Sequence, residues 1–149
     1  MTHRTIALDA ALAVATLNGV AGLYGLLRWH RAAPSRSFWL VARAAQVFAI
    51  AYAVLAAAYY LASYKPSSNL FYLYALLPLA IGVIAEQFRV LSADHVLTQC
   101  DLPDAQAVGK LAPAEQQAVV TAILGRELLI IALACLVVCF LALRAWGTY

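Results

Sequence analysis

Residues 44–64 read AAQVFAIAYAVLAAAYYLASY and contain no charged side chain. An α-helix needs about 20 apolar residues to cross the roughly 30 Å of hydrocarbon in a bilayer, because each residue advances it by about 1.5 Å. Alanine and leucine dominate the apolar residues of the chain, which favours helices over the strands of a membrane barrel. This stretch is therefore predicted to be a transmembrane helix.

Three further runs of the sequence lack charge. Residues 10–27 and 66–85 are long enough to cross a bilayer, whereas residues 128–143 reach that length only if the helix also accommodates Arg126 and Glu127. Of the 149 residues, 65% are hydrophobic and 11% are charged, against about a quarter charged in soluble domains. A chain this small cannot bury so much apolar surface within itself, so lipid must cover the rest.

The connections between these runs contain residues typical of turns and helix starts. Ser35 or Ser37 is placed to cap the second helix, and the short connection at residues 65–68 makes the second and third helices antiparallel neighbours. In the longer third connection, residues 101–104 begin a short turn or helix. Pro113, at a first helical position, begins the last long helix.

These features predict one all-α domain over residues 1–149. The expected fold is an integral membrane, antiparallel four-helix bundle with short loops and a longer cytoplasmic connection between the third and fourth helices. The predicted transmembrane spans are approximately residues 6–28, 37–64, 68–92 and 114–146.

The basic residues predict an orientation, because cytoplasmic loops carry an excess of Lys and Arg. Most of them lie in or beside the first and third connections: Arg28, Arg31, Arg36, Arg43, Arg89, Lys110 and Arg126. We therefore expect a multi-pass membrane protein whose first and third connections are cytoplasmic and whose termini both lie outside the cytoplasm.

Polar residues of three spans fall at a similar depth near the predicted cytoplasmic side. They are Arg43, Gln46, Glu86, Gln87, Arg89, Arg126 and Glu127. An unpaired charge in hydrocarbon costs several kcal/mol, so these side chains are expected to face inward and pair. The expected pairs are Arg43 with Glu86, and Arg126 or Arg89 with Glu127.

Three interpretations of this polar layer stay open. In the first, it is a structural layer of ion pairs that fixes helix register. In the second, it is a ligand, quinone or proton site built from Glu86 and Arg43. In the third interpretation the arginines extend separately to the membrane surface without mutual contact. Pro78 and Gly82, on the same span as Glu86, add weight to a cavity because they permit a kink.

The first span carries small residues at positions that permit close helix packing. They are Ala15, Gly19, Gly22 and Gly25. Such residues let helices approach closely, either within the chain or between subunits. Asn18, in the same span, is a candidate for an interhelical hydrogen bond.

The sequence favours a non-enzymatic role. It contains no nucleophile motif, phosphate-binding loop or dinucleotide fingerprint, and the histidines lie outside the apolar runs where a haem between helices would need them. The cysteines and histidines show no zinc-like spacing, so no metal site is predicted. The net charge of +3 forms no basic patch, which argues against nucleic acid.

The leading functional prediction is a small oligomer or accessory subunit of a membrane complex, with the lipid bilayer and other membrane subunits or copies of itself as partners. One alternative is a small transporter or channel that uses the polar layer. The other is a redox subunit that binds quinone or haem; no cofactor is predicted otherwise.

Overall fold

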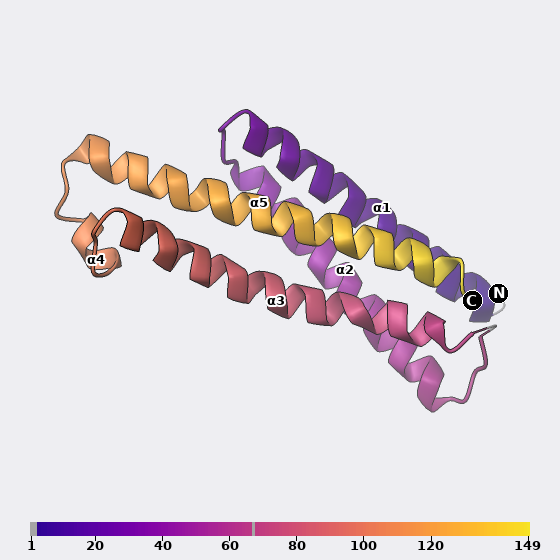
Figure 1. The fold of residues 1–149 in the computed structure, drawn as a ribbon. Helices are drawn as coiled ribbons and strands as arrows, with labels where there is room; N and C mark the ends of the chain where they lie inside the picture. The colour runs from indigo at the N-terminus through magenta and orange to yellow at the C-terminus, as the bar shows by residue number, and fades with distance from the viewer. Residues whose placement is uncertain (1–2, 67) are drawn as a thin grey trace.

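The computed structural model describes residues 3–66 and 68–149 and confirms the all-α, four-helix fold. The helices are α1 (His3–His30), α2 (Arg36–Leu61), α3 (Leu70–Gln99), α4 (Ala105–Val108) and α5 (Pro113–Trp146), and no strand occurs in the described residues. The four long helices are each long and apolar enough to cross a membrane. The start of α1 and the end of α5 lie at the same end of the bundle (Figure 1).

Local sequence explains where several helices begin. Pro113 occupies the start of α5, as predicted, and Glu115 places an acid in its first turn. The side chain of Asp104 caps α4 by accepting a hydrogen bond from the backbone N–H of Ala107 at 2.8 Å. Ser35 does precede α2, but its hydroxyl bonds the Ser37 hydroxyl at 2.6 Å and makes no capping bond.

Helix α3 continues well past residue 92, where the third span was expected to end. Val96 and Leu97 at this end of α3 pack against Val119 of α5, and the apolar contact stabilises both helices there. The two helices and α4 consequently project beyond the ends of α1 and α2 (Figure 1). Glu86 therefore lies deep within its helix, farther from the helix end than the sequence suggested.

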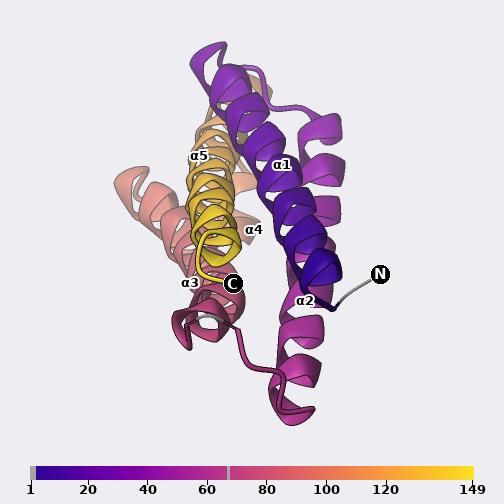
Figure 2. The same ribbon diagram turned by 90° about the vertical axis from the view of Figure 1, so that its right-hand side faces the viewer.

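Helix α5 packs between α1 and α3, while α2 packs against α1 and α3 and makes little contact with α5 (Figure 2). The small residues of α1 allow the closest approach. A Cβ atom at Gly25 would lie 2.5 Å from Phe38 Cε2 and 2.6 Å from Ala132 Cβ. At Gly22 it would lie 2.6 Å from the Leu136 side chain. Close packing by these small residues thus occurs within the chain.

Two groups of buried side chains form the core of the bundle. One, toward the chain ends, contains Tyr52 and Phe71, and the other contains Phe38 and Leu128. Between these two groups of side chains, α2 and α5 lie apart, because α2 packs mainly against α1 and α3. This separation leaves a cleft at the middle of the bundle.

Candidate functional site

The cleft lies between α2, α3 and α5 and has a volume of about 480 Å³. Ligand sites for small molecules typically enclose about 300–1,000 Å³. Its walls are mostly apolar, and three of the apolar residues that line it are also exposed on the outside of the bundle: Ile50, Leu79 and Val83. These residues place the open side of the cleft on the outer surface of the bundle, between α2 and α3.

Small side chains keep the cleft open. Gly82 of α3 lines it, and a Cβ atom built at this position would meet nothing within 4 Å. Ala49 of α2, Ala85 of α3 and Ala134 of α5 also line it, each with a side chain of a single carbon. A larger residue at Gly82 would therefore extend into empty space.

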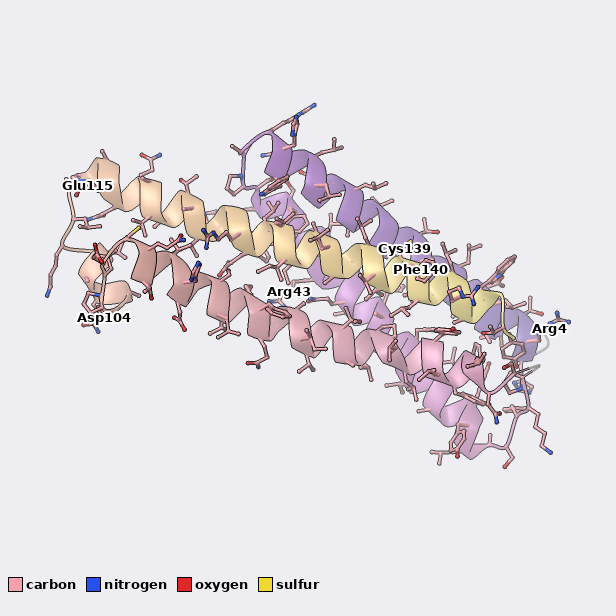
Figure 3. All side chains as sticks on the ribbon, viewed as in Figure 1. Arg4, Arg43, Asp104, Glu115, Cys139 and Phe140 are labelled. Carbon is pink, nitrogen blue, oxygen red and sulfur yellow. The ribbon has the colours of Figure 1, made fainter. Side chains whose placement is uncertain are left out.

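A cluster of charged residues closes one end of the cleft. Arg43 Nη1 donates to Gln46 Oε1 at 2.8 Å and to Glu86 Oε1 at 3.0 Å. The expected Arg43–Glu86 pair thus joins α2 to α3. Arg43 reaches into the space between the helices near the middle of the molecule (Figure 3).

A second arginine contacts the same carboxylate. Arg89 Nε lies 3.1 Å from Glu86 Oε2, in a charge contact that lacks the alignment of a hydrogen bond. The Arg89 guanidinium also lies over the Trp39 ring, with 5.9 Å between its central carbon and the ring centroid. One carboxylate therefore faces two guanidinium groups, and the Arg43–Glu86–Arg89 cluster carries a net positive charge.

Asn18 of α1 is the one buried polar residue in the described part of the chain, with 2% of its surface exposed. Its amide nitrogen donates to the carbonyl oxygens of Val14 at 3.0 Å and, across to α2, Ala45 at 3.4 Å. The expected interhelical bond is thus present. The side chain also lines the cleft, and its carbonyl oxygen accepts no hydrogen bond from any described residue.

The other residues of the predicted polar layer lie apart from this cluster. Gln87 lines the cleft at its exposed edge. Arg126 Nη2 donates to Gln99 Oε1 at 2.9 Å and ties α5 to the projecting end of α3. Glu127 forms no ion pair with the described residues, so its expected pairing with Arg89 or Arg126 is wrong. Arg89 contacts Glu86 instead, and Arg126 contacts Gln99.

The sequence suggested a cavity beside Glu86, through Pro78 and Gly82, in only one of its open interpretations, and it gave no role to Trp39. Trp39 precedes Arg43 by one helical turn, so the two share a helix face, and this spacing was a usable signal. The shared contact with Glu86 also contradicts the interpretation in which Arg43 and Arg89 extend separately to the membrane surface.

The described residues contain no group of three or more His, Cys, Asp and Glu side chains that converge as metal ligands. The chemistry of the cleft is instead that of an apolar chamber with hydrogen-bond donors and a positive charge at one end. Comparison with known proteins finds no matching family model, no matching curated protein and no matching solved structure.

Proposed function

We propose that this small polytopic membrane protein is non-enzymatic and binds an amphiphilic molecule that enters from the bilayer. The observation that supports this function is the cleft, which joins apolar walls to the cluster at Arg43 and Glu86 and opens toward lipid. An amphiphile matches both halves, because its chain needs an apolar surface and its headgroup needs polar partners.

The position of the polar groups favours a binding site over a transport pathway. Arg43, Gln46 and Glu86 gather at one end, whereas Ile50, Leu79 and other apolar residues line the walls. Channels and ion transporters line the selective part of their pathway with polar or charged groups, which replace the water around the ion. A quinone is itself an amphiphile, so the redox alternative predicted from the sequence becomes one special case of this proposal.

Filling the cleft tests the proposal. In phosphatidylcholine proteoliposomes, a diazirine-labelled fatty alcohol should crosslink to residues that line the cleft. Gly82→Leu places a side chain in the empty space and should reduce this crosslinking by at least about tenfold, which corresponds to about 1.4 kcal/mol of binding free energy.

Gly125→Leu is the matched control. A Cβ atom at Gly125 of α5 also meets nothing within 4 Å, and this glycine does not line the cleft. Crosslinking should therefore stay at the wild-type level. Equal crosslinking of the wild type and Gly82→Leu, or none at the cleft in either, would contradict the proposal.

The proposed orientation places α4 and the connection between α1 and α2 in the cytoplasm, on the basis of the Lys and Arg distribution. Cys100, just after α3, is exposed, whereas Cys135 is buried and Cys139 is partly buried. A membrane-impermeant maleimide should therefore label Cys100 in inside-out vesicles and not in right-side-out vesicles. Cys100→Ser should abolish the signal, and the reverse pattern would invert the orientation.

Membership of an oligomer or larger complex stays a prediction. The small residues Gly22 and Gly25, which suggested it, pack against neighbouring helices of the same chain. Lipid contact has broader support, since large apolar side chains are exposed on all four long helices.

A further inference from the structure

We infer that the amphiphile is an anion, with a carboxylate or phosphate headgroup that binds Arg43 and an apolar chain that fills the cleft. This inference rests on the function proposed above and adds the charge of the ligand. It follows from the balance of charge at the polar end of the cleft, from the freedom of one arginine and from the surplus of hydrogen-bond donors there.

The charge balance favours a negative ligand. Glu86 is the single acid in contact with both Arg43 and Arg89 among the described residues. The cluster therefore has one positive charge without a partner, and such a charge is costly within a membrane. One ionised carboxylate or phosphate in the cleft would make the cluster neutral.

The two arginines differ in their freedom to bind a ligand. Arg89 is held by Glu86 and by the Trp39 ring, and it does not line the cleft. Arg43 does line the cleft, and 54% of its side chain is exposed. When Arg43 binds a headgroup, Glu86 keeps Arg89 as its partner, so no charge is left uncompensated.

Donors also outnumber acceptors at this end. A guanidinium group has five N–H donors, and only Nη1 of Arg43 has partners among the described residues. The amide nitrogen of Gln46, which lines the cleft, also makes no hydrogen bond with them. Asn18, on α1, instead presents its side-chain carbonyl oxygen, a hydrogen-bond acceptor that would repel an anionic headgroup. The headgroup is therefore expected on the α2–α3 side, beside Arg43 and Gln46.

The volume and the lateral opening suit one apolar chain, and two sources share this chemistry. A free fatty acid would place its whole chain within the cleft. An anionic phospholipid would place one chain there and leave the other in the bilayer, through the opening beside Ile50 and Val83.

A competition experiment tests the sign of the charge. The diazirine-labelled fatty alcohol serves as the tracer in phosphatidylcholine proteoliposomes at alkaline pH, so that acids are ionised. Palmitate should displace it at a concentration at least about tenfold lower than hexadecanol, its uncharged counterpart. Phosphatidylglycerol is the third competitor. Displacement by phosphatidylglycerol but not by palmitate would also support the inference and identify a phospholipid as the source.

Three variants locate the effect. Arg43→Gln removes one headgroup donor, so it should weaken crosslinking of the alcohol in part and remove the preference for palmitate in the crosslinking that is left. Circular dichroism of the purified variant should show that its helices are still folded. Arg43→Lys keeps the charge and should retain part of the preference. Arg126→Gln is the matched control, because Arg126 contacts Gln99 away from the cleft.

The failures of the two proposals are distinguishable. If neither palmitate nor phosphatidylglycerol competes better than hexadecanol, or if Arg43→Gln keeps the preference for the anion, the assignment of an anion to Arg43 is overturned while the amphiphile site stands. If the tracer does not crosslink to the cleft at all, the proposed function falls and the inference falls with it.

Discussion

Replacing Gly25 with alanine is expected to lower the free energy of unfolding by about 1–3 kcal/mol, the usual cost of an overpacked core. The added methyl group would meet Phe38 Cε2 at 2.5 Å and Ala132 Cβ at 2.6 Å. Phe38 is fully buried, so its ring cannot turn aside into open space. Helices α1 and α5 would have to move apart, and thermal unfolding in phosphatidylcholine nanodiscs should begin at a lower temperature.

The same substitution at Gly82 is the internal control and should act in the opposite direction. Its Cβ position has no neighbour within 4 Å, so alanine adds helix propensity without a clash. We expect a gain of up to about 1 kcal/mol. If Gly25→Ala were as stable as the wild type, the packing of α1 on α5 and α2 described above would be wrong.

Replacing Glu86 with glutamine is expected to lower the free energy of unfolding by about 2–3 kcal/mol, between the costs for exposed and buried ion pairs. The value is intermediate because both side chains are partly exposed, Arg43 by 54% and Glu86 by 33%. The change leaves two arginines without an acid, and each unpaired charge is costly within a membrane.

Arg43→Gln is the informative comparison, because it also breaks the ion pair between α2 and α3 but leaves Glu86 paired with Arg89. It should therefore cost clearly less than Glu86→Gln. Urea or thermal unfolding of both variants in nanodiscs measures the difference. Equal losses would mean that the charge balance of the cluster does not matter and only the contact between α2 and α3 does.

The sequence was sufficient to predict the parts of the structure that depend on local composition. The uncharged run at residues 44–64 predicted a membrane helix, and Pro113 predicted the start of α5. The Arg43–Glu86 pair was also predictable, because each charge at a similar depth in the membrane needs a partner of opposite sign.

Pro78 and Gly82 suggested a cavity beside Glu86, but its walls on α2 and α5 were not predictable because they depend on helix tilt. In the sequence, Ala49 and Ala134 look like ordinary packing residues. They line a cavity only because α2 lies apart from α5. Gln99 was not considered as a partner for Arg126, since the third span was expected to end before it. The packing of Val96 on α5 extends α3 and brings this glutamine within reach.

The inward packing of the α1 glycines also determines what the surrounding bilayer encounters. The exposed face of the helix carries large aliphatic side chains: Leu12, Val20, Leu23 and Leu27. Acyl chains solvate such a surface about as well as another helix does, since both are hydrocarbon. This face of α1 therefore needs no protein partner to cover it, since lipid can do so.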